Sequence, residues 1–173
     1  MDVFVYGTLT EPERVRELLD SFAFVGAATL VGLRVVEGRY PTLALPAADG
    51  GADATAVGDA GDTADSTDSG DSTDRVPTHR TAEVDAAVGG RLLRTDEVDA
   101  LDAYEGVADD LYTRVAVPLL APDGTQRGEA AVYVGDPDRL GAAATWPGTA
   151  PFPERVRAAL AERRVTVRER PER

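Results

Sequence analysis

Two short segments place groups that could bind an anion or transfer a proton at the predicted ends of a strand and a helix. Residues 6–9, Tyr-Gly-Thr-Leu, follow an apolar strand, and successive backbone N–H groups of such a turn can cradle a carboxylate or an oxyanion. Residues 104–106, Tyr-Glu-Gly, close a predicted helix. Residues 6–9 could instead be an ordinary turn. Glu105 could instead be one exposed glutamate among 31 acidic residues.

Glu105 is the candidate acid/base. A helix C-terminus carries partial negative charge and disfavours an ionised carboxylate. Asp102, Asp109 and Asp110 are close in sequence and would add like-charge repulsion. Both effects, together with any partial burial, should raise the pKa of Glu105. A carboxyl group that titrates nearer neutrality can both accept and donate a proton.

Other catalytic chemistries find little support in the sequence. The only histidine, His79, lies at the edge of an acidic low-complexity segment, and three of the four serines lie inside that segment. There is no cysteine, and no phosphate-binding glycine loop or metal-ligand motif occurs. Carboxylates, tyrosines, arginines and backbone amides remain as the groups that could act.

The elements that must position these groups indicate an α+β domain. We expect a small mixed, curved or closed β-barrel-like sheet flanked by about three helices. Thr10 is the expected N-cap of the first helix, with Pro12 near its first position, and Thr95 is the expected cap of the second, which Gly106 ends. The predicted strands are 3–6, 28–37, 40–45, 88–93, 112–120 and 128–135, the later helices are 95–105 and 152–164, and a short segment 165–167 follows.

An acidic insert interrupts this pattern at about residues 47–84. Residues 49–74 are Asp, Gly, Ala, Thr and Ser apart from one valine, so they cannot bury enough apolar area to offset the entropy of ordering. Asp recurs at every third position from Asp59 to Asp74, which could suggest a cation-binding repeat, but the glycine spacing of calcium-binding solenoids is missing. We predict one domain, 1–173, containing a disordered insert.

Composition narrows the partners. The formal net charge is −13 and all 18 basic side chains are arginine, a pattern that resembles proteins of salt-loving organisms. The arginines near the C-terminus alternate with glutamates, so we expect no nucleic-acid partner. No apolar run reaches membrane-spanning length and the N-terminus has no apolar leader, so we expect no membrane partner and a cytoplasmic location.

The combined motifs resemble the gamma-glutamylcyclotransferase-like superfamily. The matching features are residues 6–9 after the first strand, Leu101-Asp102-x-x-Glu105-Gly106, and Tyr112-x-Arg114, in that order. Further agreement comes from Gly32, Tyr40-Pro41, Gly90 and residues 131–133. The resemblance covers residues 1–45 and 88–135, about half of the chain.

The resemblance implies a small mixed barrel in which residues 6–9 and Glu105 meet in one cavity. It implies release of 5-oxoproline from a small γ-glutamyl compound, with no metal or organic cofactor, and with Glu105 as base and then acid. Backbone amides of residues 7–9 would hold the substrate carboxylate or polarise the carbonyl. The implied substrate-binding residues are Tyr6, Gly7, Thr8, Leu9 and Tyr112.

Three alternatives stay open at this point. Tyr6 could be a core strand aromatic, Tyr133 is expected in the core, and Arg114 is expected to form an ion pair rather than to anchor a substrate carboxylate. The leaving group could be an amino acid, a cysteine-type thiol compound or an amine. The chain could instead be a non-catalytic binder of a small metabolite, or use its acidic insert as an interaction module.

Overall fold

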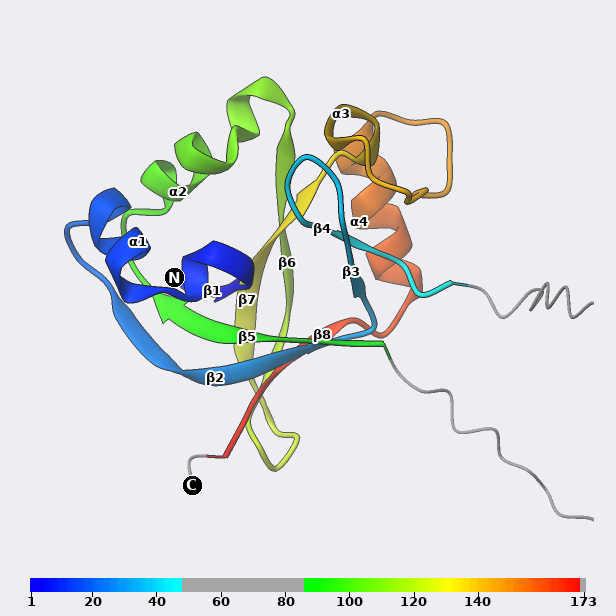
Figure 1. Cartoon of the computed structure of the whole chain (residues 1–173). Helices are drawn as coiled ribbons and strands as arrows, with labels where there is room; N and C mark the ends of the chain where they lie inside the picture. Colours follow the sequence, from blue (N-terminus) through cyan, green and yellow to red (C-terminus); the bar gives the residue numbers. More distant parts are fainter. Residues whose placement is uncertain (48–85, 172–173) are drawn as a thin grey trace, which may run out of the picture. The chain divides into compact units, whose positions relative to one another are not determined.

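Eight strands, four α-helices and two short 3-10 helices make up the described part of the chain, residues 1–47 and 86–171 of a computed structural model (Figure 1). The predicted acidic insert falls outside the described residues except for Ala47, so the single-domain prediction stays a prediction. The elements are β1 Asp2–Val5, η1 Gly7–Thr10, α1 Pro12–Leu18, β2 Ala23–Val31, β3 Arg34–Val36, β4 Thr42–Ala44, β5 Ala87–Arg94, α2 Val98–Glu105, η2 Val107–Asp109, β6 Tyr112–Leu120, β7 Gln126–Gly135, α3 Pro137–Leu140, α4 Phe152–Glu162 and β8 Thr166–Glu169.

Six of the strands form a closed barrel in the order β1-β5-β2-β8-β6-β7. The barrel closes where β1 runs parallel to β7, with Val3 opposite Ala131. Strands β6 and β8 form a second parallel pair, and the other neighbouring strands of the barrel are antiparallel. Strands β3 and β4 pair separately as a small hairpin. The predicted α+β class with a closed mixed sheet and flanking helices is confirmed.

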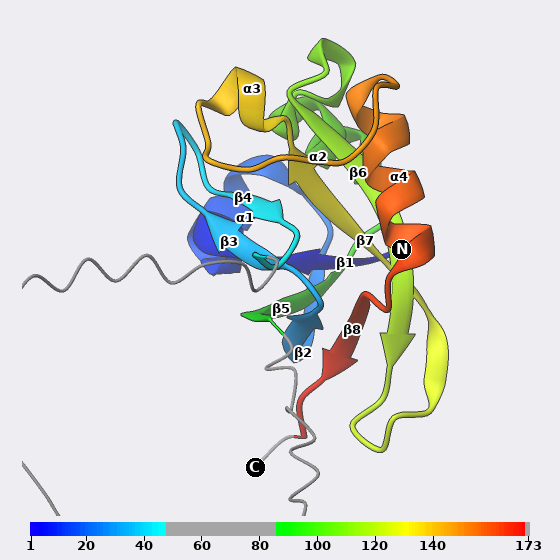
Figure 2. The same ribbon diagram turned by 90° about the vertical axis from the view of Figure 1, so that its right-hand side faces the viewer.

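The alternation of side chains along each strand divides the apolar residues between two cores. Phe4 joins a cluster to which all six barrel strands contribute, and this cluster is the barrel interior. Helix α4 adds Phe152 and Val156 to it. Val3 and Val5 point the other way, into a second cluster with residues of α1 and α2. Figure 1 shows α1 and α2 lying together, apart from α3 and α4, and Figure 2 gives the same arrangement from the side.

The local differences from the sequence predictions occur at turns. The predicted strand 28–37 is two strands, because Gly32 takes a positive φ of 96° and turns the chain between β2 and β3. Thr10 is not the cap of α1: Glu11 precedes Pro12, and the Thr10 hydroxyl donates instead to the Gly7 carbonyl at 2.6 Å. Helix α2 begins at Val98 rather than at residue 95, although the Thr95 hydroxyl does accept a bond from the Glu97 amide at 3.0 Å.

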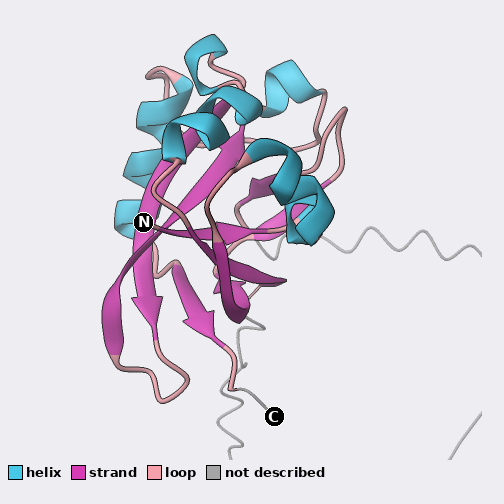
Figure 3. Ribbon diagram, turned by 90° about the vertical axis from the view of Figure 1, so that its left-hand side faces the viewer, coloured by secondary structure: helices cyan, strands magenta, loops and turns pink. Residues whose placement is uncertain are grey.

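The strand directions bring the predicted site segments to one end of the barrel. Strands β1 and β7 run in the same direction, so they end together, and β6 begins there because Tyr112 pairs with Gly135. Helix α2 ends just before β6, so Glu105 arrives at the same place. The turn between β6 and β7 projects from the opposite end, as Figures 1 and 3 show. No helix in the described ranges combines the length and apolar character that crossing a lipid bilayer requires.

Candidate active site

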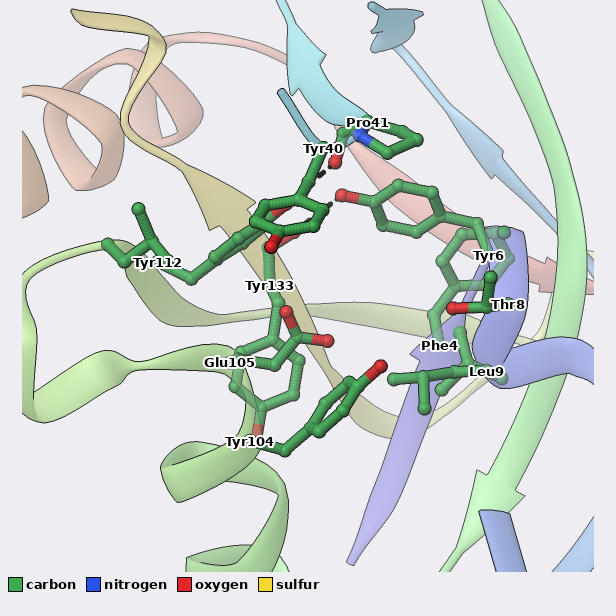
Figure 4. Close-up of a pocket in the computed structure, with 13 residues that line it drawn as sticks. Phe4, Tyr6, Thr8, Leu9, Tyr40, Pro41, Tyr104, Glu105, Tyr112 and Tyr133 are labelled. Atoms are coloured by element: carbon green, nitrogen blue, oxygen red, sulfur yellow. Dashed lines mark hydrogen bonds between the residues drawn. The ribbon is translucent and has the colours of Figure 1, made fainter. Parts of the chain in front are cut away.

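A cavity of about 380 Å³ lies where β1, α2 and β6 meet. Residues from the first strand, from η1, from the start of β4 and from the α2–β6 connection converge on it (Figure 4). The sequence-predicted residues at positions 6–9, 105 and 112 all line this one cavity. The full lining is Phe4, Val5, Tyr6, Gly7, Thr8, Leu9, Tyr40, Pro41, Tyr104, Glu105, Leu111, Tyr112 and Tyr133.

Glu105 is the last residue of α2, and its carboxyl group points into the cavity (Figure 4). Gly106 follows in the left-handed conformation, φ 68°, which ends the helix as predicted. Burial raises the pKa of Glu105 to about 7. The direction of this shift agrees with the sequence analysis, and its cause is the burial that the sequence analysis named beside the helix end and the neighbouring charges. Loss of hydration accounts for the shift, and repulsion from Asp102, Asp109 or Asp110 does not contribute to it.

Asp102 has no repulsive role because its charge is already paired. Its carboxylate accepts a hydrogen bond from Arg114 Nη1 at 2.8 Å and another from the Tyr133 hydroxyl at 2.7 Å. Arg114 therefore forms the ion pair with an acidic neighbour that the sequence favoured. Tyr133 packs in the second core as expected, with 3% of its surface exposed, and also contributes to the cavity wall.

Opposite the glutamate, η1 presents backbone to the cavity. Gly7 has a φ of 64°, a conformation that glycine adopts without strain, so a 3-10 helix can start directly after β1. In a 3-10 helix that starts at Gly7, the Leu9 amide bonds to the Tyr6 carbonyl, so the amides of Gly7 and Thr8 are the ones without a partner within the helix. Leu9 is buried, whereas Gly7 and Thr8 are exposed.

Arg91 holds η1 from outside the cavity. Its Nη1 atom donates to the Thr10 carbonyl at 3.2 Å, and its guanidinium carbon lies 3.7 Å from the centroid of the Phe24 ring. A cation at the carbonyl end of a helical turn is electrostatically favourable. This contact fixes the end of η1 and leaves its amide end facing the cavity.

Tyr6 and Tyr112 form the inner wall. The Tyr6 hydroxyl donates to the Tyr133 carbonyl at 3.1 Å, and the Tyr112 hydroxyl donates to the Pro41 carbonyl at 2.8 Å. Burial is the largest cause of a raised pKa at both phenols, and the nearby Glu105 charge adds to it. Both groups therefore stay protonated near neutral pH and act only through their rings and O–H groups.

Tyr40 and Tyr104 also line the cavity, although the sequence analysis did not select them as site residues. They lie at its open side, with 50% and 45% of their surfaces exposed. A signal was present in the sequence: Tyr104 adjoins the candidate acid, and Tyr40 precedes a proline at the start of a predicted strand. Apart from tyrosines, Glu105 is the one ionisable side chain in the lining, and among the described residues no three His, Cys, Asp or Glu side chains cluster as metal ligands do.

Comparison with known proteins gives one sequence match. Residues 3–69 match the model of the family described as "Gamma-glutamyl cyclotransferase, AIG2-like". No curated protein matches the sequence of the whole chain.

Solved structures show a likeness of fold. A structure titled "Gamma-glutamyl cyclotransferase" aligns at 15% identity and a TM-score of 0.48, over 79% of this chain and 66% of that chain, so this chain spans slightly less than two thirds of that protein. A solution structure of a protein from Arabidopsis thaliana aligns at 24% identity and a TM-score of 0.46, over 93% of this chain and 83% of that one. An uncharacterized protein from Homo sapiens aligns at 13% identity and a TM-score of 0.51, over 91% and 96%.

The sequence match begins in the first strand and includes the Tyr-Gly-Thr-Leu segment that lines the cavity. It confirms the predicted likeness of this chain to the gamma-glutamylcyclotransferase-like superfamily.

Proposed function

We propose that the chain is a cyclotransferase that releases 5-oxoproline from a small γ-glutamyl compound. The observation that carries this proposal is the Glu105 carboxyl group, which is partly buried, has a pKa raised to about 7 and points into a cavity walled on another side by η1. The family-model match supports an activity of this type.

The reaction is an intramolecular acyl transfer. The substrate ammonium gives a proton to Glu105, and the resulting α-amine attacks the γ-carbonyl carbon to form the ring C–N bond. The bond from that carbon to the departing nitrogen then breaks as Glu105 returns the proton to that nitrogen. The ring nitrogen gives up its second proton, through Glu105 or solvent, to the departing amine, which leaves as an ammonium. The products are 5-oxoproline and a free amine or amino acid, with no water consumed.

The pKa of Glu105 suits both proton transfers. A carboxyl with its ordinary value of 4.5 would be a weak base at neutral pH, whereas one that titrates at about 7 exchanges protons in either direction. General acid–base catalysis by a positioned group contributes about 10²–10⁴-fold in rate. Holding the amine near the carbonyl supplies a further part of the acceleration, because the reacting groups belong to one molecule.

Of the amides of residues 7–9, those of Gly7 and Thr8 are the proposed partners of the anionic part of the substrate, because the Leu9 amide is bonded within η1. Peptide N–H groups without a partner at a helix start stabilise a carboxylate or a developing oxyanion. The walls formed by Tyr6 and Tyr112 would exclude water and, through their committed hydroxyl groups, stay in fixed positions. These steps require no metal or organic cofactor.

Release of 5-oxoproline from γ-glutamyl amino acids and γ-glutamyl amines tests the proposal, with wild type compared against Glu105→Gln. We expect the substitution to reduce turnover at least 100-fold while the protein stays folded. Asp99→Asn removes the same charge from an exposed position on the same helix and is the matched control. Turnover that survives in Glu105→Gln would refute the mechanism, and binding without turnover by the wild type would indicate a non-catalytic metabolite binder.

A further inference from the structure

The charged side chains that line the cavity limit which leaving groups it can bind, and this inference rests on the proposed reaction. The chain contains five tyrosines, and all five line this cavity. No arginine or histidine of the described residues, 1–47 and 86–171, belongs to the lining, and the chain has no lysine. The described lining therefore offers aromatic rings, backbone amides and one carboxyl group, and none of its side chains is cationic.

Three of the five phenol groups are committed to the protein. The Tyr6 hydroxyl donates to the Tyr133 backbone carbonyl, and the Tyr112 hydroxyl donates to the Pro41 backbone carbonyl. The Tyr133 hydroxyl donates to the Asp102 carboxylate. The rings at the open side, Tyr40 and Tyr104, are about half exposed, and each lies near enough to Tyr112 to raise its pKa. These two rings therefore lie between the cavity and solvent, where a leaving group that extends out of the cavity would contact them.

We propose that the leaving group is an aliphatic amine that carries, besides the nitrogen bonded to the γ-carbonyl, a distal positively charged group and no carboxylate. An ammonium over a tyrosine face is attracted by the ring quadrupole. A carboxylate in the same place would lose hydration without gaining a cationic partner, and it would share the cavity with Glu105. The amides of η1 do not compensate for this, since the proposed reaction already assigns them to the γ-glutamyl end of the substrate.

The surroundings of Tyr40 agree with this assignment. The Arg39 guanidinium lies 5.7 Å from the centroid of the Tyr40 ring without lining the cavity, so this ring already accommodates a cation. The same arginine is the alternative partner for a leaving-group carboxylate. A test must therefore separate recognition of a cation by the tyrosines from recognition of an anion by Arg39.

Three γ-glutamyl amides with the same four-carbon spacer provide that test. Their amines are 1,4-diaminobutane, which adds a cation, n-pentylamine, which is neutral, and 5-aminopentanoate, which adds an anion. We expect kcat/KM to be about tenfold higher for the cationic amide than for the neutral one, and lower still for the anionic amide. An anionic amide that matches or exceeds the cationic one would overturn the inference.

Substitutions locate the origin of the preference. Tyr104→Leu and Tyr40→Leu should bring the ratio of cationic to neutral kcat/KM towards one. Arg39→Gln should leave the order of the three substrates unchanged; loss of activity on the anionic amide alone would instead assign Arg39 to a carboxylate. The assays are repeated in concentrated salt, because long-range attraction by the net charge of −13 is screened there and contact with a ring is not. A preference that vanishes in salt and survives both tyrosine substitutions would refute the tyrosine assignment.

A binding measurement separates this inference from the proposed reaction. Calorimetric titration of Glu105→Gln with the three intact amides requires no turnover. We expect the cationic amide to bind about tenfold more tightly than the neutral one. If no amide releases 5-oxoproline but this order of binding is found, the reaction fails and the charge preference stands. Equal binding of all three, or none, overturns the preference.

Discussion

Two carboxyl groups on α2, one helical turn apart, lie in opposite environments. Asp102 faces β6 and β7, where Arg114 and Tyr133 each donate a hydrogen bond to it. Glu105 ends the helix and enters the cavity, where burial alone governs its ionisation. The two residues have the same chemistry and the same helix, so their different behaviour comes from the partners that the barrel supplies.

The contrast separates a structural carboxylate from a reactive one. The Asp102 carboxylate is committed to two protein donors, the Arg114 guanidinium and the Tyr133 hydroxyl, and holds them in place. A buried carboxyl without a cationic partner holds its proton to higher pH and can exchange it near neutrality. The ion pair commits Arg114 to Asp102, and Arg114 is not among the described residues that line the cavity.

The largest effect that would follow from this contrast is on the pH dependence of turnover. Glu105 must be ionised to accept the substrate proton, and its pKa is about 7. We expect kcat/KM to approach a tenfold fall for each pH unit below that value, or about 50-fold between pH 7 and pH 5, since half of Glu105 is already protonated at pH 7. Initial rates of 5-oxoproline release across this range, with Asp99→Asn as control, check the prediction. A midpoint near 4.5 would mean that the carboxyl group that titrates has an ordinary pKa and is not shifted by burial.

A second effect concerns stability. Because burial raises the pKa of Glu105 from 4.5 to about 7, the folded state binds a proton that the unfolded state has released between those values. The unfolding free energy therefore falls as the pH rises through this window, by about 3 kcal/mol, and the loss is complete above pH 7. Glu105→Gln lacks this loss.

Denaturant unfolding of wild type and Glu105→Gln at pH 5 and pH 8.5 measures this effect. The variant should gain stability relative to wild type as the pH rises. A constant difference between the two proteins would show that Glu105 is hydrated in the folded state.

The sequence predicted the residues of the site better than the physical cause of their properties. The position of Glu105 before a helix-ending Gly106 and that of residues 6–9 after the first strand were visible as local patterns, and both segments line one cavity. The pKa shift was assigned partly to Asp102, because neighbours in sequence were the only charges in view. The pairing of Asp102 with Arg114 depends on β6 packing against α2, which no local pattern reports.

The fold was predictable to the extent that it depends on local periodicity. The strands at residues 112–120 and the closed mixed sheet follow from apolar patterns and turn residues. The division of the predicted strand 28–37 into β2 and β3 was not, because Gly32 lies within a continuous run of strand-forming residues and only its positive φ divides them. Tyr40 and Tyr104 were not selected as site residues, because the sequence does not show that these two exposed aromatic side chains line the same cavity.

Asp102→Asn sharpens the contrast by breaking the other member of the pair. Loss of the charged acceptor leaves the Arg114 guanidinium, which is about one-third exposed, without its ion pair. We expect the unfolding free energy to fall by about 2 kcal/mol. This change has the opposite sign to that of Glu105→Gln at pH 8.5. Unfolding curves at pH 8.5 measure both, and a stabilised Asp102→Asn protein would contradict the structural role given to this carboxylate.

Tyr133→Phe tests the smallest part of the contrast, the phenol that donates to Asp102 at 2.7 Å. The ring remains to pack in the second core, so only the hydrogen bond is removed. We expect a loss of about 1 kcal/mol in unfolding free energy. In the Asp102→Asn background the same substitution should cost less, because the two groups act through one contact and their effects are not additive. A double-mutant cycle by urea unfolding measures this coupling. Full additivity would mean that the Tyr133 hydroxyl stabilises the barrel independently of Asp102, and the environment of that carboxylate would then rest on Arg114 alone.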